Sequence, residues 1–298
     1  MERGSATRGK VAALVSGANS IEIKVTIPES QVDSSLARFG LTIANDEERY
    51  VYFYDTPDLD LHRAGIITRA RRVVGDQHDS TVKFRPVIPD HVASKWRTFS
   101  DFKIEADASE KGVTKSASFS MPVRKGVIKR IAAGEIAIEE LFTKDQQAFL
   151  LSMANRNIDF STMMVFGPLR AHRWKFEDPG CPWPITAEVW VREDGARMME
   201  ASIKAPVVQA AAAMGGFTAF LAEFGAERDV EEQAKTRWAL MYYAEKLRKA
   251  GTGEPGQRAL AAAPAPGSKS AKRAKRSSKV KAGKRVKGLA KGKGRTKK

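Results

Sequence analysis

The stretch SIEIKVTI, residues Ser20–Ile27, alternates polar and apolar side chains without a break. Successive side chains of a β-strand point to opposite faces, so this segment would place Ser20, Glu22, Lys24 and Thr26 on one face and four Ile or Val side chains on the other. A half-buried antiparallel strand with a solvated face has the same pattern. The number of other strands that repeat it decides whether the polar face is only solvated or lines a site.

Seven further segments are predicted as strands, and several also carry fixed charges on one face. They lie at residues 49–54, 66–74, 80–86, 101–107, 169–177, 184–192 and 199–205. Because residues two apart share a face, alternation groups Arg69 with Arg71 and Lys83 with Arg85. A solvated surface would mix polar residue types, whereas paired cations on some strands and acids on others indicate clusters that face each other.

Closing these strands into a barrel would turn the charged faces inward, around a lumen too polar to be a core. At least five cations would then face one another: Arg69, Arg71, Lys83, Arg85 and Arg173. Cations in a poorly hydrated interior repel one another unless an anion with several charges lies between them. The acids of the same faces, Glu22, Glu105, Glu188 and Glu200, would hold a divalent cation that bridges phosphate oxygens. The pattern therefore predicts a multi-phosphate ligand with its metal.

Three stretches within about residues 20–205 resemble the CYTH superfamily, the triphosphate tunnel metalloenzymes. This family includes inorganic triphosphatases, thiamine triphosphatases, class IV adenylyl cyclases and RNA triphosphatases. The resemblance rests on SIEIKV (20–25) at the family's Glu-x-Glu-x-Lys opening, on YFYDTPDLDLHRAGIITRARR (52–72) with its paired arginines, and on TVKFRP (81–86). The middle stretch is long and quite specific, whereas the other two are short.

The resemblance implies an α+β fold built on a closed, eight-stranded antiparallel β-barrel with flanking helices. Its tunnel would hydrolyse a linear triphosphate, inorganic or organic, with Mg²⁺ or Mn²⁺. The residues implied in substrate binding are Lys24, Arg69, Arg71, Lys83, Arg85, Arg173 and Lys204. The implied metal ligands are Glu22, Glu105, Glu188 and Glu200, and the implied catalytic residues are Glu22, Glu200 and Lys24.

The sequence departs from the family pattern at two positions. Ser20 stands where the opening motif has its first glutamate, and Ser202 stands where a second acid is often found on the last strand. A serine hydroxyl does not supply the charge of a carboxylate to a metal ion. Two alternatives therefore stay open: a polyphosphate- or nucleotide-binding module with weakened catalysis, and an enzyme similar to class IV adenylyl cyclases.

The net charge of +16 is concentrated at one end of the chain. Residues 251–298 hold 16 Lys or Arg and one acid, whereas the first 250 residues are nearly neutral. We therefore predict three parts: a flexible leader at residues 1–18, a triphosphate tunnel domain at 19–250 and a disordered basic tail at 251–298.

Composition also bears on the cellular setting. The single cysteine, Cys181, excludes an intramolecular disulfide framework and a cysteine-based zinc site. The apolar run VAALV, residues 11–15, is too short for the core of a signal peptide. Gln209 and Glu223 interrupt the apolar segment 205–224, which favours a packed helix over a membrane span. We expect a cytoplasmic protein.

The basic tail generates the first testable prediction. It contains no aromatic residue for stacking on bases, so we expect sequence-independent electrostatic binding to nucleic acid or long polyphosphate. Deleting residues 251–298 should abolish DNA binding in titrations at several salt concentrations, while cleavage of short tripolyphosphate persists. Binding by the intact chain should fall with salt, with a log–log slope of about −0.7 to −0.9 per neutralised phosphate. Equal DNA affinity of the two forms would exclude this role.

Overall fold

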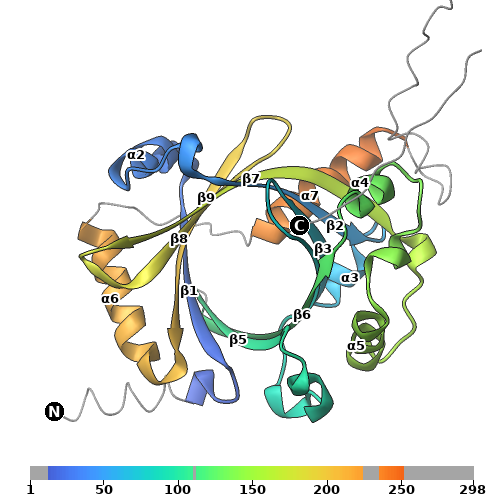
Figure 1. Ribbon diagram of the computed structural model, residues 1–298, viewed down its shortest axis with the longest axis horizontal. Coiled ribbons are helices and arrows are strands. Elements are labelled where there is room, and N and C mark those ends of the chain that lie inside the picture. The colour runs from blue at the N-terminus through green and yellow to red at the C-terminus, as the bar shows by residue number, and fades with distance from the viewer. Residues whose placement is uncertain (1–12, 110–111, 224–234, 252–298) are drawn as a thin grey trace, which may run out of the picture. The chain divides into compact units, whose positions relative to one another are not determined.

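A computed structural model describes residues 13–109, 112–223 and 235–251 of the chain. Within these ranges, nine strands close into a β-barrel in the order β1-β5-β6-β4-β3-β2-β7-β8-β9 (Figure 1). The strands are β1 Ser20–Ile27, β2 Glu47–Asp55, β3 Ile66–Val73, β4 His78–Phe84, β5 Phe102–Ser109, β6 Gly112–Val123, β7 Met164–Asp178, β8 Cys181–Val191 and β9 Arg197–Pro206. Each of the eight predicted strand segments overlaps one of them.

The prediction of eight antiparallel strands is wrong in number and in direction. The ninth strand is β6, whose inward positions include Ser118 and Ser120 instead of charged residues, so the charge pattern did not indicate it. A closed ring with an odd number of strands cannot alternate direction throughout, and at least one neighbouring pair must be parallel. That pair is β1 and β5, in which Ser20 lies opposite Glu105, whereas every other neighbouring pair of the described barrel is antiparallel.

The predicted flanking helices are present and cover the outer face of the barrel (Figure 1). The α-helices are α2 Val32–Arg38, α3 Asp60–Arg63, α4 Val127–Ala132, α5 Lys144–Ala154, α6 Ala210–Glu223 and α7 Lys235–Lys249. Short 3-10 helices lie at Glu29–Gln31, Ile43–Asn45, Pro89–His91, Ser94–Thr98, Ile138–Leu141, Phe160–Thr162 and Val207–Gln209. None of the helices in the described part of the chain is long and apolar enough to cross a membrane.

The hydrophobic core lies outside the barrel, between its strands and these helices. Helix α6 packs on β1, β8 and β9, where Phe217 and Phe220 join the buried side chains of Ile21 and Ile203. Helix α5 packs on β4 and β6, and the ring of Phe149 lies 5.3 Å from that of Phe84 between centroids. Because the apolar half of each strand is used for this outer core, the polar half is left to face the lumen.

The two ends of the chain lie largely outside the described residues. The predicted tail at 251–298 is described only at Gly251, and the predicted leader at 1–18 only from Ala13 onward. Within that leader, Val15 is buried and belongs to the same core cluster as Ile21.

The loop between α3 and β3 generates a stability prediction. Gly65 has φ +74°, and a Cβ there would overlap the carbonyl oxygen of Arg85. Gly40 has a similar φ of +64° with open space around it. We expect both Gly→Ala variants to lose about 1 to 2 kcal/mol through the left-handed backbone conformation. Gly65→Ala should lose more, because the backbone at Arg85 must also move.

Thermal unfolding of the two variants measures this difference. The Gly40→Ala protein serves as the matched control for the cost of a positive φ alone. Equal unfolding temperatures would show that the approach of Gly65 to Arg85 does not constrain the fold.

Candidate functional site

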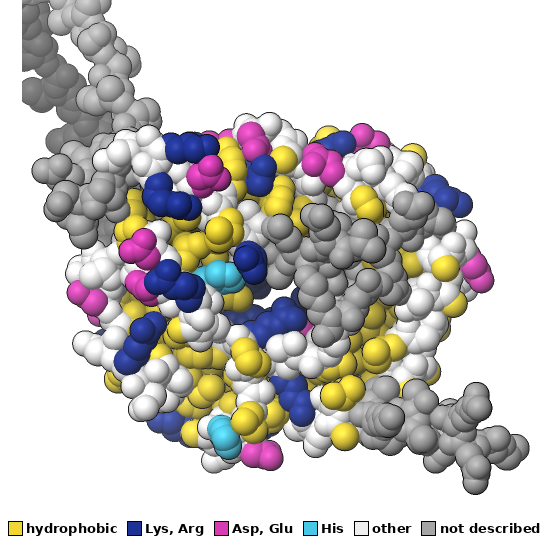
Figure 2. Space-filling view, turned by 180° about the vertical axis from the view of Figure 1, so that it is seen from behind, with side chains coloured by type: hydrophobic (Ala, Val, Ile, Leu, Met, Phe, Trp, Pro, Cys, Tyr) yellow, Lys and Arg dark blue, Asp and Glu magenta, His cyan; other side chains and the backbone are white. Residues whose placement is uncertain are grey.

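The inward faces of the strands enclose a polar cavity of about 640 Å³, which we call the tunnel cavity. Among the described residues, ten Lys or Arg and five Asp or Glu line it. Lys and Arg side chains are visible within the opening in Figure 2. The cations are Lys24, Arg49, Arg69, Arg71, Lys83, Arg85, Lys103, Arg173, Lys204 and Lys235, and the acids are Glu22, Glu105, Asp107, Glu188 and Glu200.

All of the site residues predicted from the sequence lie in this lining. They are Glu22, Lys24, Arg69, Arg71, Lys83, Arg85, Glu105, Arg173, Glu188, Glu200 and Lys204. Strand alternation brings them together, because each strand turns its polar face inward when the sheet closes. Of the two departures from the family pattern, Ser202 belongs to the lining, whereas Ser20, at the first position of β1, lies outside it.

Asp107 on β5 is the centre of one group of charges. Its side chain is 2 % exposed, and its Oδ2 accepts hydrogen bonds from Lys83 Nζ at 3.1 Å and from Ser116 Oγ at 3.0 Å. Lys24 Nζ lies 3.4 Å and Arg85 Nε 3.8 Å from its two carboxylate oxygens. Burial alone would raise the pKa of Asp107, but the surrounding cations outweigh burial and hold this pKa below its ordinary value.

Two more carboxylates on this side of the tunnel cavity are paired with lysines. Lys24 Nζ lies 2.9 Å from Glu22 Oε2, and Lys204 Nζ donates a hydrogen bond of 2.6 Å to Glu105 Oε1. Burial opposes the charge on Lys24, yet the carboxylates around it, Glu22 first, raise its pKa above the ordinary value. Lys24 therefore remains charged at neutral pH.

Four guanidinium groups gather on β2, β3 and β7, and we call them the arginine cluster. They belong to Arg49, Arg69, Arg71 and Arg173. Three of them have acidic partners. Arg71 Nε donates to both oxygens of Asp79 at 3.0 Å, Arg49 pairs with Glu47, and Arg173 lies 3.7 Å from the same Glu47 carboxylate.

Arg69 differs from the other members of the arginine cluster. Its Nε is buried and makes no hydrogen bond within the described part of the chain. Burial, and then the nearby charge of Arg71, lowers the pKa of Arg69 to about 10. At neutral pH the guanidinium is thus charged, and its Nε–H is available to an acceptor that enters the cavity.

Glu188 on β8 and Glu200 on β9 form an acidic wall beside the arginine cluster, with Glu188 paired in register with Arg173 of β7. The two glutamates lie directly opposite each other in the strand register, with both side chains in the cavity lining. Lys235, on α7, donates a hydrogen bond to Glu188, and its Nζ lies 2.8 Å from Glu200 Oε1. The pKa of Glu188 would rise through burial, but Lys235 outweighs this effect and lowers it.

The four predicted metal ligands share the cavity without forming a metal site. No group of three or more His, Cys, Asp or Glu side chains among the described residues is placed to hold a metal ion. Instead, Glu22 pairs with Lys24, Glu105 with Lys204, and both Glu188 and Glu200 with Lys235. The donor set in this arrangement therefore does not fit Mg²⁺ or Mn²⁺, which require several oxygen ligands around one point.

Four charged lining residues were not in the predicted site: Arg49, Lys103, Asp107 and Lys235. Lys103 shares a strand face with Glu105 but was assigned no role. Asp107 has the right alternation, but it was left out because it ends its predicted strand segment. Arg49 shares a face with Val51 and Phe53, so no charge pattern marked it. Lys235 lies on a helix remote in sequence, and no local signal would have placed it beside Glu188.

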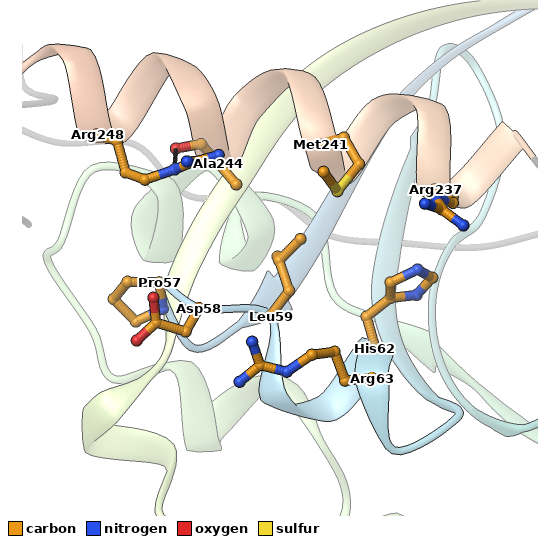
Figure 3. A pocket seen from close by; sticks show the side chains of 9 residues that line it. All are labelled: Pro57, Asp58, Leu59, His62, Arg63, Arg237, Met241, Ala244 and Arg248. Carbon is orange, nitrogen blue, oxygen red and sulfur yellow. Dashed lines mark hydrogen bonds between the residues drawn. The ribbon is translucent and has the colours of Figure 1, made fainter.

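A second cavity of about 520 Å³ shares the lining residue His62 with the tunnel cavity. Figure 3 shows the side chains that line this second cavity. Leu59, Met241 and Ala244 supply apolar surface between the α3 region and α7. Arg63, Arg237 and Arg248 also line it, and Arg63 is paired with Asp60.

The sequence matches no family model and no curated protein. The fold does match solved structures. One, described as a candidate adenylate cyclase from Bacillus halodurans, is 14 % identical, with a TM-score of 0.52 over 74 % of this chain and 97 % of that one. Another is HpAC1 from Hippeastrum, a candidate adenylyl cyclase whose description gives a dominant triphosphatase activity. It is 15 % identical, with a TM-score of 0.51 over 78 % of this chain and 96 % of that one.

These neighbours have CYTH-type structures, and the barrel of this chain has the CYTH, or triphosphate tunnel, fold. The type of fold predicted from the three sequence stretches is thereby confirmed. At 14 % and 15 % identity, the match concerns the fold alone.

Asp107 generates a prediction on stability and pH. Asp107→Asn leaves Lys24 and Lys83 without this partner, so we expect a loss of about 3 to 5 kcal/mol in the free energy of unfolding at pH 7. Because the folded-state pKa is lowered from 3.8, the contribution is complete above about pH 5, begins to fall near pH 3.8 and is lost as pH approaches the lowered folded-state pKa. The difference in the free energy of unfolding between wild type and Asp107→Asn should therefore become smaller at acid pH.

Urea unfolding at pH 7 and at about pH 3 measures that difference. Asp101→Asn, at an exposed position just before β5, is the control and should change stability little at either pH. If the free energy of unfolding of Asp107→Asn differs from that of wild type by the same amount at both pH values, the charge of this carboxylate does not stabilise the fold.

Proposed function

We propose that the tunnel cavity binds a linear triphosphate, inorganic or organic, and hydrolyses it. The observation that carries the proposal is the excess of cations over acids, ten against five, in one cavity enclosed by a barrel. A linear triphosphate carries several negative charges along a narrow chain, so it matches a narrow lumen with cations on several sides. A neutral or cationic ligand would leave this excess uncompensated.

The arginine cluster supports contact with phosphate in particular. A guanidinium presents five N–H donors in a planar fork that matches the oxygens of a phosphate group. Arg69 offers a buried Nε–H that no described side chain uses, and Arg71 and Arg173 lie in the same lining. We therefore assign the substrate-binding role to Lys24, Arg69, Arg71, Lys83, Arg85, Arg173 and Lys204, with Arg49 added.

Hydrolysis would use the same cations. Preorganised Arg and Lys side chains stabilise negative charge that develops on phosphate oxygens in the transition state, without the cost of reorienting water. The dominant triphosphatase activity given for HpAC1 supports this reaction class for a barrel of this fold. Catalytic roles for Glu22, Glu200 and Lys24, and dependence on Mg²⁺ or Mn²⁺, remain predictions.

A second candidate function is triphosphate binding without turnover. It is favoured by one observation, that each of the five acids in the lining is within ion-pair distance of a Lys or Arg. Carboxylates engaged in this way are not available as bases or as metal ligands. The adenylyl cyclase alternative also stays open, since the Bacillus halodurans neighbour is described as a candidate for that activity.

Arg69 provides the binding test. Arg69→Gln removes the guanidinium and should raise the Kd for tripolyphosphate about 10- to 100-fold, the effect of a hydrogen bond to a charged group. Arg130→Gln is the matched control, because Arg130 lies on α4, is 57 % exposed and pairs with Glu135. Isothermal titration calorimetry measures both. Equal affinity of the two variants would remove Arg69 from the site.

A product assay distinguishes the three candidate functions: triphosphate hydrolysis, triphosphate binding without turnover, and adenylyl cyclase activity. Tripolyphosphate, thiamine triphosphate and ATP are incubated with the protein, with Mg²⁺, with Mn²⁺ and without metal, and phosphate and cyclic AMP are measured. We expect phosphate release from at least one substrate. Tight tripolyphosphate binding with no product from any substrate would establish the binding function instead, and cyclic AMP from ATP would establish the cyclase.

A further inference from the structure

Glu188 and Glu200 bring two carboxylates together on neighbouring strands of the barrel. Two carboxylates directly opposite each other on neighbouring strands repel, and the repulsion is stronger in a partly desolvated lumen. The side chains of both residues are less than one-fifth exposed. Arg49 and Arg173 lie 3.7 Å and 4.0 Å from Glu188 Oε1, and a cation placed between the two carboxylates offsets their mutual repulsion most directly.

Lys235 supplies that cation. Its side chain is 12 % exposed and contacts both carboxylates, one by a hydrogen bond and the other at 2.8 Å. Its Nζ also lies 5.0 Å from the ring centroid of Trp190, which is within the range of a cation–π interaction. Three groups from β8 and β9 thus hold one ammonium in place.

Helix α7 is anchored by contacts that do not involve this ammonium. Leu240 and Tyr243 are buried against the barrel, and Tyr243 OH donates a hydrogen bond of 2.7 Å to the carbonyl of Pro168. Arg192 stacks on Trp238, and Lys246 pairs with Glu193. The helix therefore remains docked when Lys235 is replaced, and it delivers the ammonium to a fixed point.

We propose that Lys235 is a built-in cation for the Glu188–Glu200 pair and takes the place that a divalent metal ion would occupy between them. Lys235 then neutralises Glu188 and Glu200 before the phosphate ligand binds in the tunnel cavity. A metal ion can bind these two carboxylates only when the ammonium group of Lys235 no longer lies between them. The part of this proposal that concerns the phosphate ligand rests on the proposed function. The relation between lysine and metal does not depend on that function.

The first test measures Mn²⁺ binding by electron paramagnetic resonance on the full chain, with no phosphate present. Lys235→Met retains the length of the side chain and removes its charge. We expect this variant to bind Mn²⁺ about tenfold or more tightly than wild type, because a charge-assisted competitor has been removed. Lys235→Arg, which keeps the charge, and Lys249→Met, which removes a lysine that is 76 % exposed on the same helix, should behave as wild type. Equal Mn²⁺ affinity of wild type and Lys235→Met overturns the proposal.

The second test measures tripolyphosphate affinity with EDTA and with Mn²⁺. Wild type should bind equally well in both, whereas Lys235→Met should bind about tenfold more weakly with EDTA and recover with Mn²⁺. A wild-type affinity that requires Mn²⁺ overturns the metal-independent role of Lys235. If no form binds tripolyphosphate under either condition, the proposed function fails, and the Mn²⁺ titration still decides the role of Lys235.

Discussion

Charge neutralisation inside the barrel is the constraint on which the other features of the site depend. Fifteen ionisable side chains of the described residues face one lumen, where water screens charges less than at the surface. Each carboxylate must therefore lie beside a cation, as Asp107 lies beside Lys83 and Lys24. The positions of these pairs fix the side chains of β1, β4, β5 and β9 and shape the cavity in advance of any ligand.

Charges are neutralised in different ways in two parts of the lumen. Near β1 and β5, acids and lysines balance one another within hydrogen-bond distance. In the arginine cluster the cations outnumber their acidic partners, and Arg69 has a buried donor with no acceptor among the described residues. That side of the cavity therefore offers an entering anion a buried donor. The apolar core lies outside the barrel. The apolar side chains that stabilise the fold and the charged side chains that line the lumen therefore lie on opposite faces of the same strands.

The fold and much of the candidate site were predictable because strand alternation is a local property. Arg69 and Arg71, or Lys83 and Arg85, share a face wherever the strand is placed. Strand β6 was not predictable by the same argument, since its lumen face carries serines such as Ser118. Without β6 the count was eight, and an eight-stranded ring permits the antiparallel order that the nine-stranded ring forbids.

The sequence by itself determined which side chains face inward, since the two-residue period of a strand is set by its backbone. It also determined that the body is nearly neutral and that the positive charge is concentrated at residues 251–298. Only the tertiary structure decided which charges become partners. Glu188 and Lys235 are 47 positions apart and lie on a strand and a helix that meet only after the barrel has closed. Coulomb interactions depend on separation in space, and a sequence pattern contains no information on that separation for remote segments.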